Sequence, residues 1–152
     1  MTDGNAAPVP AAALTGLHHV RLTVTDITRS KTFYTRLLGT EPAIDFTDEP
    51  LDSGVRTDPD RFFGGCTYAF IDQLLGLRPV AEHDDRFDST RVGLDHLSLG
   101  VETLDDLHRA AERLTALDVD HGDVRELPAL GIAILSFQDP DDINLELVTA
   151  IE

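Results

Sequence analysis

Near its carboxyl end the chain reads Asp139-Pro140-Asp141-Asp142-Ile143-Asn144-Leu145-Glu146-Leu147-Val148. The first four residues predict a turn, because Pro140 fixes one backbone dihedral angle and aspartate tolerates tight turns. From Ile143 onwards apolar residues alternate with polar ones, which is the period of a β-strand. Glu146 stands between two leucines, where an unpaired buried carboxylate would cost several kcal/mol. Its side chain therefore either faces solvent or has a cation or strong donors beside it.

An internal repeat relates the two halves of the chain. Residues 17–25 and 94–101 both alternate like a strand, and each segment is followed by a helix-capping residue, Asp26 or Thr103. Matching residues are always 77 positions apart: Leu17 and Leu94, His19 and His96, Leu22 and Leu99, Val24 and Val101, Ile27 and Leu104, Leu37 and Leu114. A repeat in one constant register indicates a duplicated fold more strongly than any single motif does.

Each half predicts one strand, one helix and three further strands, which together make an α+β fold. In the first half we expect strands at 17–25, 42–47, 66–72 and 74–80. The helix of this half should end at Gly39, in the left-handed conformation that glycine favours. In the second half we expect strands at 94–101, 124–127, 131–138 and 143–149. The last strands of the halves correspond, so that Leu75-Gly76-Leu77 matches Leu145-Glu146-Leu147.

The length of the chain predicts a single domain, which we expect to span residues 17–152. Module one covers 17–80, a polar linker covers 81–91, and module two covers 92–152. Residues 1–16 are rich in Ala and Pro and lack the basic start of a signal peptide, which predicts a flexible amino-terminal tail. The loop over 48–65 is longer than most loops in compact domains, and such loops are often functional.

The composition is strongly acidic, with 28 Asp and Glu against 12 Lys and Arg and a formal net charge of −16. This charge repels phosphate backbones and anionic lipid surfaces, so we expect neither nucleic acid nor a membrane as a partner. No apolar run approaches the ~20 residues that span a bilayer. Cys66 is the only cysteine, which excludes an internal disulfide and agrees with a cytoplasmic protein.

His19 and His96 occupy the same position in the two repeats. Each lies on the strand face opposite the leucine and valine side chains that should pack against the helices. Glu146 shows the same alternation in its own strand. The sequence therefore predicts that two imidazoles and one carboxylate converge in a cavity between two sheets. Such a set can bind a divalent metal ion and leave other coordination positions open for substrate or water.

These motifs resemble the vicinal oxygen chelate superfamily, which includes glyoxalase I, extradiol dioxygenases, fosfomycin-resistance proteins, methylmalonyl-CoA epimerase and bleomycin-binding proteins. The resemblance covers nearly all of 17–148 and rests on three groups of residues: His19-Val20 to Asp26 with Phe33-Tyr34 and Leu38-Gly39, then Asp95-His96-Leu97, then Asp139-Pro140-Asp141 with Leu145-Glu146-Leu147. It implies paired βαβββ modules that curve into a half-open mixed β-barrel around a metal. It also implies that His19, His96 and Glu146 are the metal ligands. A homodimer, whose sites can combine modules of both chains, is a further implication.

The chain departs from one part of this pattern. Glyoxalase I and methylmalonyl-CoA epimerase use a Glu or Gln as a fourth ligand in the last strand of the first module, where this chain has Gly76. The four-ligand site is therefore absent, and so is the carboxylate that could move a substrate proton. The remaining ligands resemble those of the fosfomycin transferases and the dioxygenases.

Three functional classes remain open. The favoured one is a metal-dependent lyase, isomerase or transferase in which Fe, Mn, Ni, Co or Zn acts as a Lewis acid on a small molecule with vicinal oxygens. The first alternative is a metal-free protein that binds a small molecule or drug, as bleomycin-binding proteins do. The second is an extradiol-type dioxygenase, which is less favoured because such enzymes usually have two domains.

Further residues on the inward strand faces and in the long loop would line the pocket. The candidate substrate-binding residues are Arg21, Thr23, Asn144, Phe62 and Phe63. Arg21 could clamp a carboxylate or phosphonate through paired hydrogen bonds, or could instead pair with one of the many acids. The two phenylalanines could close over a substrate. Tyr68 and Ser98 are the candidates for proton transfer, because no fourth-ligand carboxylate is present.

Overall fold

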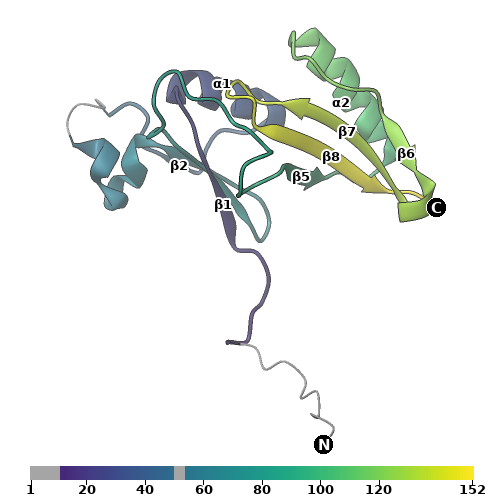
Figure 1. Ribbon diagram of the computed structural model, residues 1–152, viewed down its shortest axis with the longest axis horizontal. Coiled ribbons are helices and arrows are strands. Elements are labelled where there is room, and N and C mark those ends of the chain that lie inside the picture. The colour runs from purple at the N-terminus through teal and green to yellow at the C-terminus, as the bar shows by residue number, and fades with distance from the viewer. Residues whose placement is uncertain (1–10, 50–53) are drawn as a thin grey trace, which may run out of the picture.

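The computed structural model (Figure 1) describes residues 11–49 and 54–152 of the chain. Its strands form two four-stranded sheets, with the orders β1-β4-β3-β2 and β5-β8-β7-β6. The first sheet contains β1 (His19–Thr23), β2 (Ile44–Asp45), β3 (Cys66–Ala69) and β4 (Leu74–Arg78). The second contains β5 (Leu97–Gly100), β6 (Arg125–Leu127), β7 (Ile132–Gln138) and β8 (Asn144–Ala150). One helix follows the first strand of each sheet, α1 (Ile27–Leu38) or α2 (Leu104–Ala116). The predicted α+β fold of two βαβββ units is confirmed.

The register of the sheets shows how the two repeats align. β1 runs parallel to β4 and β5 runs parallel to β8, while the other pairs are antiparallel. Arg21 pairs with Gly76 in the first sheet, and Ser98 pairs with Glu146 in the second. Gly76 therefore occupies in the first sheet the place that Glu146 occupies in the second, as the sequence predicts.

Both helices have the caps that the sequence predicts. The side chain of Asp26 accepts a hydrogen bond from the backbone N–H of Arg29 at 3.0 Å, and α1 ends at Gly39 with a φ of 69°. At the start of α2, Thr103 and Asp106 form the reciprocal hydrogen bonds of a capping box. Neither helix is long and apolar enough to cross a membrane, and nor is any other helix in the described ranges.

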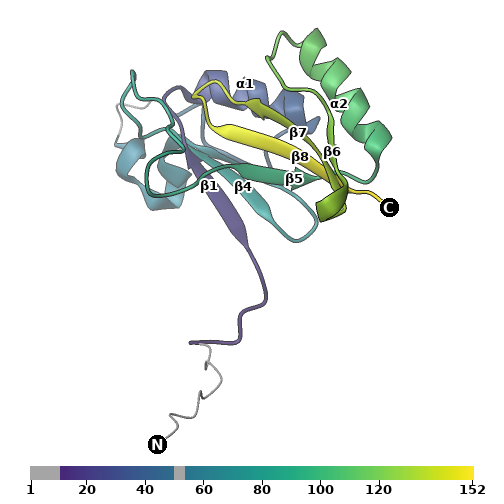
Figure 2. The ribbon, with the colours of Figure 1, turned by 45° about the vertical axis from the view of Figure 1, so that its right-hand side comes forward.

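The hydrophobic core lies between the helices and one face of each sheet. Buried residues from both repeats form a single cluster that includes Leu22, Tyr34, Leu75, Leu107 and Leu145. The two helices are neighbours on the same side of the strands (Figures 1 and 2), and Nη2 of Arg113 donates to the carbonyl oxygen of Arg36 at 3.3 Å. Neither α1 nor α2 lies over the opposite face of either sheet.

The turn between β7 and β8 joins the two repeats through two buried carboxylates. Asp139 accepts hydrogen bonds from two backbone N–H groups of its own turn and from the hydroxyl of Tyr34 on α1. Burial raises the pKa of Asp139. Asp141 accepts from the backbone N–H of Thr25 at 2.9 Å, from the Thr25 hydroxyl at 2.5 Å and from the guanidinium of Arg29 at 2.5 Å. The sequence predicts this turn but not its contacts with the first repeat.

All strands except β8 are shorter than the sequence predicts, and the long loop contains regular structure. β2 has only two residues, and the strand expected at 66–72 ends at Ala69 because the N–H of Phe70 begins a turn by donating to the carbonyl of Gln73 at 2.8 Å. The described part of the loop over 48–65 contains the 3-10 helices Val55–Thr57 and Pro59–Gly64. Residues 11–18 form neither helix nor strand, and the rest of the predicted tail lies outside the described residues.

We expect Gly65 to tolerate no side chain. A β-carbon at this position would lie 1.9 Å from the carbonyl oxygen of Leu77 on β4. Gly65→Ala must therefore push the loop away from β4, which should lower the free energy of unfolding by about 2–3 kcal/mol. Gly100→Ala is the matched control, because a β-carbon at Gly100 meets no atom within 4 Å. Urea denaturation measures both variants, and equal stability would contradict this position of the loop.

Candidate metal and substrate site

The sheet faces that point away from the helices carry most of the predicted site residues. On β1, His19, Arg21 and Thr23 are exposed, while the intervening Leu22 is buried. On β8, Glu146 is half-buried, while both flanking leucines are buried. Strand alternation thus gives each sheet one face on which the predicted polar site residues lie. Because these faces are accessible to solvent, a single chain does not bury the cavity that the sequence predicts between the sheets.

Glu146 lies on β8 of the second sheet and His96 directly precedes the adjacent strand β5, each with a supporting partner. Nδ1 of His96 lies 2.5 Å from Oδ1 of Asp95, which orients the ring and leaves Nε2 for a ligand. The hydroxyl of Ser98 donates to Oε1 of Glu146 at 2.8 Å. Ser98 and Glu146 are direct partners in the register of β5 and β8. A carboxylate behind a histidine is a common support for a metal ligand.

His19 lies on β1 of the first sheet, whereas the other two predicted ligands lie on β8 or directly before β5. Its Nδ1 is 3.0 Å from Nδ1 of His18. A small cavity of about 90 Å³ is lined by His19 and Ser98, among others, where the two sheets approach each other. Across residues 11–49 and 54–152, no three His, Cys, Asp or Glu side chains lie close enough together to hold a metal ion. The described part of one chain therefore does not bring the three predicted ligands together.

Asn144 on β8 connects β7 with the segment directly before β5. Its Nδ2 donates to the carbonyl oxygen of Asp95 at 3.2 Å, and its Oδ1 accepts from Nε2 of Gln138 at 3.0 Å. These bonds tie β7, β8 and the residues before β5 together. Asn144 thus reaches the open face, but its amide already has protein partners.

The structure places Tyr68 away from the open face, contrary to the prediction that it transfers a proton there. Its side chain is fully buried, and its hydroxyl donates to the carbonyl oxygen of Lys31 at 3.1 Å and lies 3.0 Å from Oγ1 of Thr35. Both partners belong to α1. Burial raises the pKa of Tyr68. The phenol therefore packs α1 on the first sheet, and Ser98 is the one predicted proton-transfer residue on an open face.

The end of the long loop covers part of the open face of the first sheet. Phe62 and Phe63 have left-handed backbone conformations, with φ of 50° and 59°. Cζ of Arg21 lies 5.3 Å from the ring centroid of Phe62, and Cζ of Arg78 lies 3.7 Å from that of Phe63. These are cation–π contacts. Arg78 is not among the site residues predicted from the sequence, although its position two residues after Gly76 on the same strand places it on the open face.

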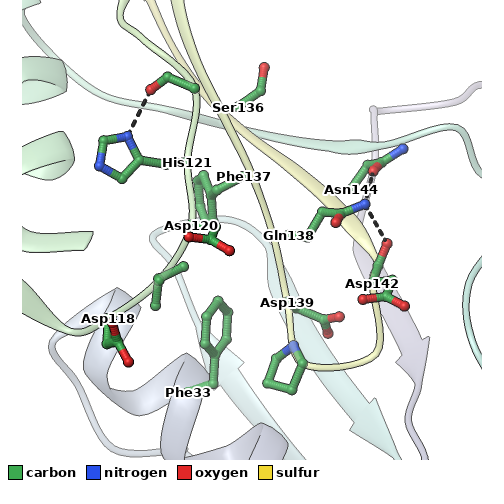
Figure 3. Close-up of a pocket in the computed structure, with 13 residues that line it drawn as sticks. Phe33, Asp118, Asp120, His121, Ser136, Phe137, Gln138, Asp139, Asp142 and Asn144 are labelled. Carbon is green, nitrogen blue, oxygen red and sulfur yellow. Dashed lines mark hydrogen bonds between the residues drawn. The ribbon is translucent and has the colours of Figure 1, made fainter. Parts of the chain in front are cut away.

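A larger pocket, of about 590 Å³, lies at the edge of β7 and contains none of the predicted metal ligands (Figure 3). Figure 3 shows His121 among aspartates and the ring of Phe33. Nδ1 of His121 lies 2.7 Å from the carbonyl oxygen of Gly122, and Nε2 lies 2.8 Å from Oγ1 of Thr115. Both ring nitrogens thus have partners, and we assign this pocket no function.

The chain belongs to the Glyoxalase/Bleomycin resistance protein/Dioxygenase superfamily, which it matches over residues 16–147. A glyoxylase/bleomycin resistance protein/dioxygenase domain from Frankia sp. EAN1pec is 31% identical, with a TM-score of 0.71 over 92% of this chain and 95% of that one. A glyoxalase/dioxygenase from Nostoc punctiforme is 19% identical, with a TM-score of 0.64 over 97% of this chain and 99% of that one.

The fosfomycin resistance protein FosX from Listeria monocytogenes is 15% identical, with a TM-score of 0.65 over 91% of this chain and 93% of that one. The similarity to the Nostoc and Listeria proteins shows a shared fold. No curated protein matches the chain. The family that the sequence motifs indicate is therefore confirmed, and the reaction has to be argued from the site.

Proposed function

We propose that this protein is a metal-dependent enzyme that acts on a small molecule with two vicinal oxygen atoms. The observation that carries the proposal is that Glu146 on β8 and His96, directly before the adjacent strand β5, are each held by a second side chain, Ser98 or Asp95. A divalent ion binds well to a carboxylate that a hydroxyl holds in place, together with an imidazole whose Nε2 is available. In this proposal His19 supplies the third ligand.

The donor set suits Fe, Mn, Ni, Co or Zn, and a bound ion would supply Lewis-acid stabilisation of negative charge on the substrate oxygens. Gly76 offers no fourth ligand, so that more than one coordination position is left for the substrate. Asp95 keeps the proton on Nδ1 of His96, and Ser98 keeps the carboxylate of Glu146 oriented. Lyase, isomerase and transferase reactions next to a carbonyl are all consistent with these roles.

The complete site, in this proposal, forms between two copies of the chain. Within the described residues of one chain, the three proposed ligands do not come together. A two-fold axis that places the first sheet of one copy against the second sheet of its partner creates two equivalent sites. Leu17 and Ile71, at one end of the first sheet, are 75% and 99% exposed and offer apolar surface for such a contact.

Metal content tests the proposal directly. Purified protein should bind about one divalent ion per chain, and Glu146→Ala should lower the affinity at least about 100-fold, because losing a mere supporting partner already costs about 10–100-fold. Elemental analysis after supplementation with each of the five metals measures this. Glu126→Ala, at an exposed position on β6, is the matched control and should keep its metal. A metal-free wild type, or Glu146→Ala with the wild-type content, contradicts the proposal.

The second candidate function is metal-free binding of a small molecule. One observation favours it, namely that the three predicted ligands do not converge within the described part of one chain. A wild-type protein that stays metal-free after supplementation but still binds a small molecule would support this function instead.

A further inference from the structure

We infer that the open face of the first sheet binds an anionic group, a carboxylate or a phosphonate, through Arg21, Arg78 and Thr67. We call this surface the arginine patch, and it consists of these three residues with Gly76, Phe62 and Phe63. As part of a substrate site the patch rests on the proposed function. As an anion-binding surface it stands independently of any metal.

Two guanidinium groups converge in the arginine patch without a carboxylate between them. Cζ of Arg21 lies 6.0 Å and Cζ of Arg78 lies 3.7 Å from the ring centroid of Phe63. Neither arginine forms an ion pair within the described part of the chain, although the chain has 28 acidic residues. Two like charges against one ring repel each other, and a bound anion would neutralise both.

The patch also contains buried polar atoms that lack a hydrogen-bond partner. Thr67 is 3% exposed, and its Oγ1 makes no hydrogen bond within the described residues. Nε of Arg78 is buried and unpartnered in the same way. Buried polar atoms are normally paired, and leaving one unpaired is costly. An oxyanion in the patch would accept hydrogen bonds from both groups.

Gly76 makes room for this arrangement. A β-carbon at Gly76 would lie 3.3 Å from both Cγ and Nε of Arg21 and 3.5 Å from Oγ1 of Thr67. The side chain of Arg21 therefore lies across the glycine, and its Nε and the threonine hydroxyl flank the same point above β4. Gly76 stands where other family members have a fourth metal ligand, and it thus allows the side chain of Arg21 to lie there instead.

The patch lies next to the proposed metal ligand His19. Arg21 follows His19 by two residues on the same face of β1, a spacing of about 7 Å along a strand. The rings of Phe62 and Phe63 lie against the guanidiniums, and apolar groups beside an ion pair strengthen it. The substrate of the proposed enzyme therefore carries an anionic group close to its chelating oxygens.

Titration of the full-length protein with methylphosphonate and with acetate tests the patch. The protein is first freed of metal with a chelator that is then removed by gel filtration. The Nε–Hε resonances of Arg21 and Arg78 in proton–nitrogen correlation spectra should shift, with a dissociation constant of about 1–10 mM for the better anion. Dimethyl methylphosphonate, which carries no charge, should not move them, and nor should chloride at equal ionic strength. The two anions distinguish a phosphonate site from a carboxylate site.

Substitutions locate the binding. Arg21→Met and Arg78→Met should each weaken binding of the better anion by about tenfold or more, and Thr67→Val by about threefold. Arg125→Met, at an exposed position on β6, is the matched control and should bind like the wild type. Backbone amide spectra check that each variant is folded. If Arg78→Met is not folded, Arg78→Lys is used in its place.

Arginine resonances that neither anion moves, or an equal loss of binding in Arg125→Met, would overturn the inference. The same titration of Glu146→Ala separates this result from the metal proposal, because the patch should keep its anion affinity when the proposed metal ligand is gone. Metal content then tests the proposed function, and the arginine resonances test the patch.

Discussion

Asp141→Ala is expected to lower the free energy of unfolding by about 3 kcal/mol. The side chain of Asp141 is 4% exposed and accepts hydrogen bonds from the backbone and hydroxyl of Thr25 and from the guanidinium of Arg29. Alanine would leave the N–H of Thr25 unpaired at a part-buried position. It would also remove the acceptor that joins the β7–β8 turn to the first repeat.

Two milder substitutions provide the controls for Asp141→Ala. Thr25→Val removes only the hydroxyl, and Arg29→Met removes a guanidinium group from a side chain that is 40% exposed. Each should cost about 1 kcal/mol. Guanidinium chloride denaturation ranks the three variants by their free energies of unfolding. If Asp141→Ala costs no more than Thr25→Val, the carboxylate does not join the repeats in the way described.

The fold can be predicted from this sequence because its main signals are local or repeated. Asp26, Gly39 and Thr103 act on backbone groups within a few residues, so the ends of the helices follow from the sequence alone. The role of Asp141 does not follow in this way. Its partners Thr25 and Arg29 lie 116 and 112 positions away, and no period in the sequence shows which distant groups will pack on a turn.

The site is less predictable than the fold, because alternation assigns a strand face but does not show what the face meets. His19 and Glu146 do lie on strand faces that point away from the helices, and His96 directly precedes β5, but whether the three side chains meet depends on the packing of the two sheets. The orientation of Tyr68 could not be predicted for a different reason. In Cys66-Thr67-Tyr68-Ala69 both alternating sets contain small or amphipathic residues, so the sequence does not reveal that Tyr68 faces α1 and Thr67 the open side.

His19→Ala and His96→Ala should each abolish metal binding, with affinities at least about 100-fold below the wild type. Both side chains are exposed, so the free energy of unfolding should change by less than about 0.5 kcal/mol. Elemental analysis and urea denaturation of the same samples measure the two quantities separately. A variant that keeps its metal would remove that histidine from the proposed ligand set.

The metal content of a mixed dimer of His19→Ala and His96→Ala chains tests most directly whether two chains share each site. Differently tagged chains are refolded together, and pairs that carry both tags are isolated. One of the two sites is then intact, because His19 of the His96→Ala chain meets His96 and Glu146 of the His19→Ala chain. The mixed dimer should therefore hold about half the metal of the wild-type dimer, although each parent variant binds none. A mixed dimer as metal-free as its parents, or no mixed dimer at all, would contradict a site shared between two chains.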